Sequence, residues 1–232
     1  VQACLASIPD TEQDGDVDAA RKHMFAIHDQ GFFNNAWFSD PMILGRYPED
    51  GLALLGSEMP ALQPGDLATI NQPLDFFGVN IYSGRHVRAT ADGGAEPIKG
   101  RDLPVTAMGW PVTPEALYWG PRFLHERYRL PIVITENGMA NEDCVGEGVV
   151  HDQPRIDFLR QYLAEYGRAI DDGVPALGYF LWSVMDNFEW AEGYDKRFGL
   201  IHVDYASQRR TLKDSAGWYR QVIDSNGAIL AG

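Results

Sequence analysis

The chain has 232 residues, of which 45% are hydrophobic and 12% aromatic, enough to build a packed core and to exclude a disordered chain. Its 33 acidic and 19 basic side chains give a formal net charge of -14. Because this charge repels phosphate backbones and anionic lipids, nucleic acid and membrane surfaces are excluded as partners.

Short apolar runs alternate with amphipathic segments along the chain. An acidic loop is expected at 9–16, and Thr113 with Pro114 is typical of a helix start. Gly120 and Pro121 predict a kink in that helix. In chain order we expect strands at 1–8, 74–80, 131–135 and 178–182, and helices at 17–29, 113–129, 152–170 and 213–224. This alternation predicts an α/β fold of parallel β/α units, as in part of a (β/α)8 TIM barrel.

Polar and aromatic residues stand where the predicted strands end, or follow soon after. They are Asn80, Tyr82, Glu136, Trp182, Glu189 and Trp190. Because the carboxyl ends of the strands form the functional face of a β/α barrel, we expect these side chains to lie together. A carboxylate among aromatic rings is typical of a sugar site. Glu136 with Asn137 and Gly138 is also compatible with a plain hairpin exit, and each ring with an ordinary core position.

Several motifs resemble glycoside hydrolase family 1. Ile-Thr-Glu-Asn-Gly at 134–138 is similar to the nucleophile motif of that family, and Phe-Gly-Val-Asn-Ile-Tyr at 77–82 is similar to its Gly-Val-Asn-Tyr-Tyr segment. The stretch at 182–199 resembles the long family signature nearly residue for residue. Further segments follow the family in the same order, at 31–41, 45–48, 108–110 and 214–219. The resemblance covers essentially the whole chain.

The resemblance implies that Glu136 is the nucleophile of a retaining β-glucosidase, which forms a covalent glycosyl-enzyme intermediate. Tyr82 would hydrogen-bond to Glu136 and hold it ionised and oriented, and Asn80 would support the catalytic carboxylates from beside them. The family usually has a tyrosine at the position of Ile81. Strand alternation points that side chain away from a sugar that Tyr82 faces, so the departure leaves the site intact.

The resemblance also implies which residues bind the substrate. Trp182, Glu189 and Trp190 would line the subsite of the non-reducing sugar. Trp110 would stack on the leaving group, and Phe198 would pack near the hydroxymethyl group of the sugar. The peptide bond that follows Trp182 is expected to be cis, as it commonly is in the family.

Members of the family are longer than this chain, and the Asn-Glu-Pro motif that carries their acid/base carboxylate has no counterpart here. Residues 1–232 therefore resemble the C-terminal half of one TIM-barrel catalytic domain, roughly its last four β/α units, with the N-terminal half absent. A retaining site needs two carboxyl groups ~5 Å apart, of which Glu136 supplies one. We expect the isolated chain to be inactive, and the N-terminal half of the same barrel to be its partner.

The substrates that the resemblance implies are β-glucosides or cello-oligosaccharides, cleaved at their terminal non-reducing β-D-glucosyl residue. Glu189 would repel a phosphate, and Phe198 stands where family members that cleave 6-phosphoglucosides carry a tyrosine, which favours neutral glucosides. A 6-phospho-β-glucosidase and a broad β-glycosidase of the same family are alternatives. A non-catalytic sugar-binding half-barrel is the alternative from another class.

The sequence predicts neither a cofactor nor a metal ion. Asp14, Asp16 and Asp18 alternate as in a calcium loop, but the downstream glutamate is missing, which favours a solvated loop. Cys4 and Cys144 are too few for a disulfide framework or a zinc site. No apolar run approaches the ~18 residues of a membrane span. The two cysteines fit a reducing cytoplasm and no Asn-x-Ser/Thr sequon is present, so we expect a cytoplasmic protein, from a bacterium.

Overall fold

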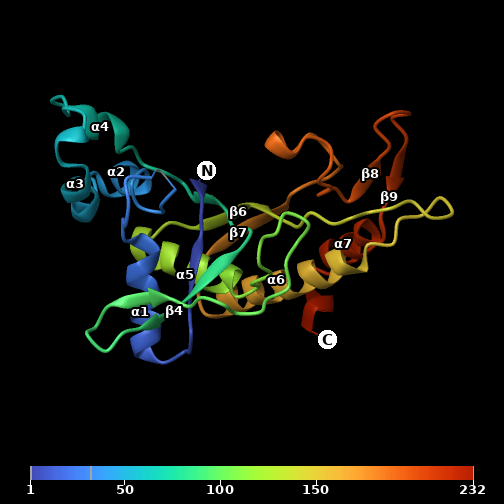
Figure 1. Ribbon diagram of the computed structural model, residues 1–232, viewed down its shortest axis with the longest axis horizontal. Helices are drawn as coiled ribbons and strands as arrows, with labels where there is room; N and C mark the ends of the chain where they lie inside the picture. The colour runs from blue at the N-terminus through green and yellow to red at the C-terminus, as the bar shows by residue number, and fades with distance from the viewer. Residues whose placement is uncertain (1, 32, 232) are drawn as a thin grey trace.

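The main sheet has four parallel strands and carries the candidate site at one edge. The computed structural model describes residues 2–31 and 33–231. The strands are β1 (Gln2–Ala3), β3 (Phe77–Asn80), β6 (Ile132–Asn137) and β7 (Ala176–Leu181). They pair in the order β1-β3-β6-β7, and every pairing is parallel. The predicted parallel β/α arrangement is therefore present in this sheet (Figure 1).

The single strand predicted at 1–8 is wrong, because this run divides between two sheets. Its first residue, Val1, lies outside the described residues. After β1 the chain passes Leu5, which is 47% exposed, and continues as β2 (Ala6–Pro9), a fully buried strand. β2 pairs in parallel with β4 (Gly84–Ala89), which pairs antiparallel with β5 (Ala95–Pro97). An apolar run satisfies either sheet, so the sequence pattern could not show this change of partner.

Two predicted strands differ from expectation in their bounds and burial. The run expected at 74–80 begins as a strand only at Phe77, because Leu74 and Phe76 are 45% and 46% exposed. The run expected at 178–182 forms β7 two residues earlier, and its Leu177 and Phe180 are 63% and 61% exposed. Among the described residues β7 pairs only with β6, so its other edge is open.

Four long helices correspond to the predicted ones. They are α1 (Asp14–Phe25), α5 (Ala116–Tyr128), α6 (Gln153–Asp171) and α7 (Asp214–Asp224). The prediction of a solvated loop over Asp14, Asp16 and Asp18 is wrong, because all three belong to the start of α1. Asp16 accepts hydrogen bonds from the amide of Ala89 and the hydroxyl of Thr11. Acidic side chains at the N-terminus of a helix also interact favourably with the helix dipole. Pro121 lies inside α5, where the kink stays a prediction.

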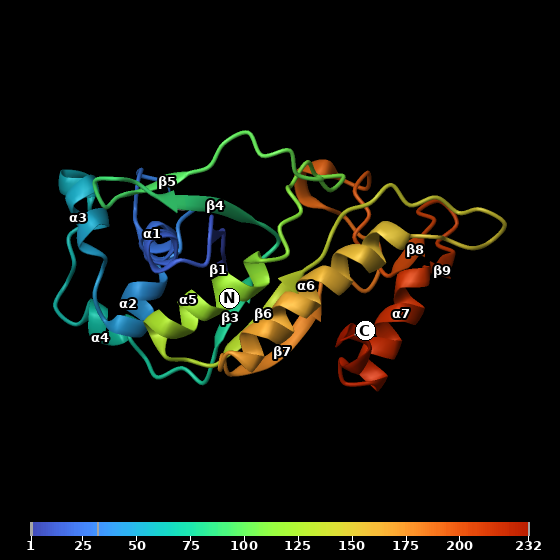
Figure 2. The ribbon, with the colours of Figure 1, turned by 90° about the horizontal axis from the view of Figure 1, so that it is seen from below.

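Most of the short elements that the sequence pattern did not predict lie toward the two ends of the molecule. Figures 1 and 2 show α2, α3 and α4 gathered at one end and the β8–β9 hairpin with α7 at the other. The helical elements are α2 (Ser39–Leu44), α3 (Glu49–Leu55), η1 (Gly56–Glu58), α4 (Asp66–Ile70), η2 (Trp190–Glu192) and η3 (Ala228–Ala231). The hairpin strands are β8 (Ile201–Val203) and β9 (Arg210–Leu212).

Much of the core lies between the main sheet and helices α5 and α6, which cover the same side of it (Figure 2), and the core continues into β2, β4 and α1. The sheet contributes Val79, Ile132 and Ile134, each 0% exposed. Phe123 of α5 and Leu159 of α6, also 0% exposed, pack in the same cluster. Burying side chains of this size stabilises the fold by about 1.5–3 kcal/mol each. This packing fixes the strands whose carboxyl ends carry the candidate site.

Candidate active site

Glu136 lies near the carboxyl end of β6, with parallel strands on both sides. The register pairs Asn80 with Glu136, and the Ile81 amide donates a 3.0 Å hydrogen bond to the Glu136 carbonyl. Because β6 pairs in parallel with both β3 and β7, the hairpin alternative for 136–138 is excluded. The carboxylate is therefore held at a strand end, beside the ends of its neighbours.

Tyr82 donates a 2.7 Å hydrogen bond to Oε2 of Glu136. Burial raises the pKa of Tyr82 well above its usual value, and the hydrogen bond to Glu136 and the negative charges of Glu136 and Glu189 raise it further. The phenol therefore stays protonated and remains a hydrogen-bond donor to the carboxylate. The neighbouring Ile81 is 0% exposed and packs in the core, which confirms that it points away from Tyr82.

Two aromatic side chains pack on the ring of Tyr82. The ring of Trp110 lies 5.2 Å from that of Tyr82, and the ring of Phe198 lies 6.2 Å from it. Trp110 and Phe198 are 6.1 Å apart, so the three rings contact one another. Phe198 is only 2% exposed. The structure thus brings both predicted binding residues to Tyr82, and through it to Glu136.

Trp182 and Glu189 meet beyond the end of β7. Nε1 of Trp182 donates a 3.4 Å hydrogen bond to Oε2 of Glu189, and the peptide bond after Trp182 is cis, as expected. Trp190 is placed differently, because it is 81% exposed. Within the described part of the chain, the side chain of Trp190 forms no hydrogen bond with Trp182, Glu189 or Glu136. Its predicted place in the sugar subsite stays a prediction.

Asn80 lies beside Glu136 at the end of β3. Its Oδ1 accepts a 2.6 Å hydrogen bond from the hydroxyl of Thr135, and its backbone carbonyl accepts one of 2.9 Å from the amide of Cys4. These bonds fix both the side chain and the backbone of Asn80. The position agrees with a residue that supports the carboxylate from one side.

Sequence reasoning missed the role of Asn137, which had suggested only a turn. Asn137 is 0% exposed and belongs to β6. Its Nδ2 donates a 2.8 Å hydrogen bond to the carbonyl of Ile81, and its Oδ1 accepts one of 2.7 Å from the hydroxyl of Tyr179. The amide thereby joins the ends of three strands around Glu136. An Asn-Gly pair after an apolar run gives no signal for this, since turns use the same residues.

Gly138 also differs from the expected turn residue. A Cβ at this position would overlap the backbone carbonyl oxygen of Trp182. The glycine is therefore needed because the segment after Glu136 passes directly against the backbone that leaves β7. This close approach brings Glu136 and Trp182 to the same edge of the sheet.

Comparison with known proteins agrees with this geometry. The sequence profile of glycosyl hydrolase family 1 matches residues 7–228. The chain belongs to glycosyl hydrolase family 1. It is 44% identical over 222 residues to beta-glucosidase A of Thermotoga maritima, a match that covers 94% of this chain and 48% of that protein. It is 42% identical over 228 residues to the bifunctional beta-D-glucosidase/beta-D-fucosidase of Bifidobacterium breve, covering 88% of this chain and 49% of that protein.

Solved structures of the family align with this family 1 chain over nearly all of its length. The Thermotoga maritima family 1 β-glucosidase in complex with isofagomine lactam matches with a TM-score of 0.80 and 42% identity, covering 97% of this chain and 50% of that one. The chain spans about half the length of the curated relatives it matches. Its α/β fold therefore corresponds to half of a family 1 TIM-barrel enzyme.

Three further properties concern the described residues of this family 1 chain. They contain no group of three or more histidine, cysteine, aspartate or glutamate side chains that could hold a metal ion. None of their helices has the length and apolar character needed to span a membrane. Cys4 is buried and Cys144 exposed, and both are free thiols.

Proposed function

We propose that this family 1 chain supplies the nucleophile and the sugar-binding side of a retaining β-glucosidase. The observation that carries the proposal is the 2.7 Å hydrogen bond from Tyr82 to Glu136 at the carboxyl ends of parallel strands. A carboxylate held by a phenol that keeps its proton is oriented for attack. The pair formed by Trp182 and Glu189 supports a binding surface for sugar hydroxyls near the same strand ends.

The proposed reaction has two steps and needs a second carboxyl group. In the first, Glu136 attacks the anomeric carbon and forms an ester, while the leaving oxygen takes a proton from a second carboxylic acid ~5 Å away. In the second, a water molecule gives a proton back to that carboxylate, and its oxygen displaces Glu136 from the sugar. Because Tyr82 occupies Oε2, we assign the attack to Oε1 of Glu136.

We propose that the second carboxyl group comes from the N-terminal half of the same barrel. Two observations support this: within the described residues the edge of β7 that faces away from β6 is free to pair with a further strand, and Leu177 and Phe180 expose apolar side chains on β7 that the other half would cover. Residues 1–232 then supply roughly the last four β/α units of one catalytic domain. We call this chain, together with that barrel half, the assembled enzyme. The chain by itself is expected to be inactive, because acid/base assistance alone contributes about 10²–10⁴ in rate.

The substrates that we propose are neutral β-glucosides or cello-oligosaccharides. The carboxylate of Glu189 supports this, because it would repel a sugar phosphate. A broad β-glycosidase is the second candidate, supported by the name of the Bifidobacterium breve relative, which includes β-D-fucosidase. The free thiols and the bacterial relatives support a reducing bacterial cytoplasm as the setting.

A mechanism-based label tests the nucleophile. The assembled enzyme is incubated with an activated 2-deoxy-2-fluoro-β-D-glucoside and digested, and the peptides are analysed by mass spectrometry. We expect the fluorosugar on Glu136, no adduct in Glu136→Gln, and an unchanged adduct in the control Glu142→Gln, whose side chain is exposed in the next loop. A sugar-binding half-barrel would bind glucose without any adduct. An adduct on another residue, or hydrolysis by Glu136→Gln at the wild-type rate, would contradict the proposal.

A further inference from the structure

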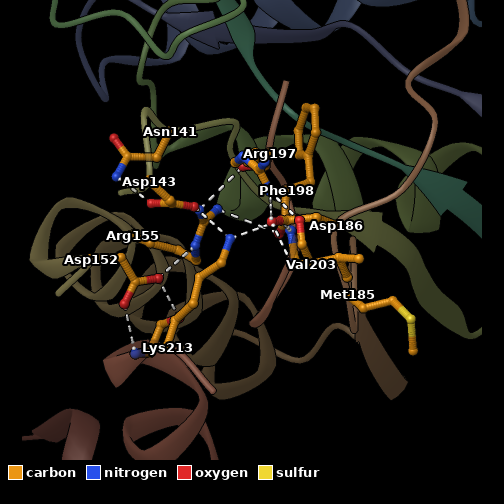
Figure 3. Close-up of polar contacts among 12 residues, drawn as sticks. Asn141, Asp143, Asp152, Arg155, Met185, Asp186, Arg197, Phe198, Val203 and Lys213 are labelled. Carbon is orange, nitrogen blue, oxygen red and sulfur yellow. Dashed lines mark hydrogen bonds and ion pairs between the residues drawn. The ribbon is translucent and has the colours of Figure 1, made fainter. Parts of the chain in front are cut away.

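A guanidinium lies buried near the site, in the first turns of α6 (Figure 3). Arg155 is 1% exposed, and it forms ion pairs with two carboxylates. Its Nε donates a 2.8 Å hydrogen bond to Asp152, and its Nη2 donates one to Asp143. The side chains of Asp143 and Asp152 are both 0% exposed. The guanidinium is therefore held in one orientation by partners that are themselves inaccessible to water.

The remaining donors of Arg155 reach the backbone of two segments that flank the site. Nη1 donates to the carbonyl of Met139, three residues after Glu136, and to the carbonyl of Phe198 at 3.4 Å. Nη2 also donates to the carbonyl of Arg197 at 3.2 Å. A guanidinium has five N–H donors, and all five are used here. One side chain thus joins the segment that follows β6 to the segment that follows β7.

The charges around Arg155 form a neutral cluster, whose members are Asp143, Asp152, Arg155, Asp186, Arg197 and Lys213. We call it the charge cluster. Lys213 donates to Asp143 at 2.5 Å and to Asp186 at 2.8 Å, and Arg197 donates to Asp186 at 2.6 Å. The ion pair of Asp186 with Arg197 joins the two ends of the segment that carries Glu189. The amide of Gly199 also donates a 3.0 Å hydrogen bond to Asp186.

Contacts lead from Arg155 to Glu136 along two routes. On the first, the carbonyl of Phe198 is held by Arg155, the ring of Phe198 packs on Tyr82, and Tyr82 holds Oε2 of Glu136. On the second, the carbonyl of Met139 fixes the chain that leaves β6 just after Glu136. One guanidinium therefore contacts both the segment that packs on Tyr82 and the segment that follows Glu136.

We propose that Arg155 is a positioning residue that sets the geometry of Glu136 for attack, an inference that rests on the proposed function. Stability alone does not explain the charge cluster. Well-packed apolar residues can replace a buried ionic group at no cost, and often with a gain in stability. The hydrogen bonds from Arg155 to three backbone carbonyls instead fix the segment that follows β6 and the segment that follows β7 in one relative position. A lysine has three donors on a flexible stem, so it cannot repeat this pattern.

The test compares Arg155→Lys and Arg155→Met in the assembled enzyme with the matched controls Arg160→Lys and Arg160→Met. Arg160 is exposed on the same helix, and its guanidinium lies 5.8 Å from the ring of Trp218. Three quantities are measured: the first-order rate of labelling at Glu136 by a saturating 2-deoxy-2-fluoro-β-D-glucoside, the binding constant of glucose, and the urea midpoint of unfolding. The labelling rate reports on formation of the glycosyl-enzyme, the step in which Glu136 attacks, without the later hydrolysis.

We expect Arg155→Lys to fold and to lower the labelling rate about tenfold to a hundredfold, because small displacements of a reacting group have effects of this size. Glucose binding is expected to change far less, and the controls are expected to label at the wild-type rate. A folded Arg155→Lys or Arg155→Met that labels Glu136 at the wild-type rate would overturn the inference while the proposed function stands. Unfolding of both variants would also overturn it, since Arg155 would then act on stability alone. Absence of any label in the wild type would contradict the proposed function instead.

Discussion

Tyr82, just beyond β3, and Glu136, in the neighbouring parallel strand β6, are joined by a hydrogen bond of 2.7 Å that the phenol donates. The strand that ends at Asn80 places Tyr82 two residues beyond it, while β6 places Glu136 at its own end. Trp110 and Phe198 pack on the ring of Tyr82 and limit its movement. The carboxylate is thus oriented by a group that is itself held by packing.

Tyr82→Phe removes this donor and keeps the ring. Hydrogen bonds to charged groups contribute about 1.5–3 kcal/mol, so we expect kcat/KM of the assembled enzyme to fall about tenfold to a hundredfold. Because burial and Glu136 raise the pKa of Tyr82 well above its usual value, the phenol does not ionise in the working range. The alkaline limb of the pH profile of kcat/KM is therefore expected to be the same in the variant and the wild type. A limb that moves with the substitution would contradict this reading of Tyr82.

Glu189→Gln tests the basis of substrate selection. Removing the negative charge is expected to lower the preference for a plain aryl β-glucoside over its 6-phosphate by at least about tenfold, since juxtaposed like charges cost several kcal/mol. The rate on the plain substrate is expected to fall as well, because Trp182 loses its charged partner. Glu192→Gln, an exposed position in the same segment, serves as the control. An unchanged preference in Glu189→Gln would mean that this carboxylate does not exclude phosphate.

Asp186→Asn is expected to destabilise the assembled enzyme by about 3–5 kcal/mol, because it leaves buried positive charge without its partner. The control Asp224→Asn breaks an exposed pair with Arg220 and is expected to cost less than about 1 kcal/mol. Urea unfolding at neutral pH measures both changes. Equal effects at the two positions would mean that Lys213 and Arg197 find other partners.

The same aspartate predicts how stability depends on acid. Burial raises the pKa of Asp186, but the hydrogen bond and charge of Lys213, together with hydrogen bonds from Arg197 and the amide of Gly199, outweigh it and hold the pKa below its usual value. A carboxyl group with a lowered folded-state pKa contributes stability above its unfolded pKa of about 3.9 and loses it as the pH falls further. The wild type is therefore expected to lose more stability than Asp186→Asn when the pH is lowered from neutral to below about 3.9. Parallel stability curves would contradict this.

Phe180→Ser tests the proposed covering of the open edge of β7. Phe180 is 61% exposed in this chain, so the substitution should matter only if another segment buries the ring. In the assembled enzyme we expect a loss of about 1.5–3 kcal/mol in the free energy of unfolding. Leu212→Ser, at a position 68% exposed on β9, is the matched control. If both serines changed stability equally little, β7 would not be the edge that the other barrel half covers.

Much of the fold could be predicted from periodicity, and the rest could not for identifiable reasons. The run at 131–135 gave the apolar part of β6, since strands buried on both faces are continuous apolar runs, but not its last two residues, Glu136 and Asn137. The run at 1–8 gave one strand instead of two, because burial does not tell which neighbour a strand pairs with. The helices between 39 and 70 are short, so their apolar spacing is too brief to be recognised.

The site divides in a similar way. Tyr82, Glu136 and Trp182 stand at strand ends, where motif and chain order both point to function. Arg155 gave no such signal, because a charged residue on an amphipathic helix is expected to face water. Only the fold shows that Arg155 faces Asp143 and the backbone carbonyls of Met139 and Phe198. Buried charges whose partners are distant in sequence escape a reading of local pattern.

The contribution of the charge cluster to stability depends on temperature. The free energy lost when charged groups leave water becomes smaller as temperature rises, whereas the gain from burying apolar surface levels off. The cluster around Arg155 therefore holds the two segments more effectively in a warm cell than in a cold one. An apolar replacement that gives the same stability near room temperature would give less than the charge cluster at a higher temperature. The contribution of the cluster to stability therefore depends on the temperature at which the protein works.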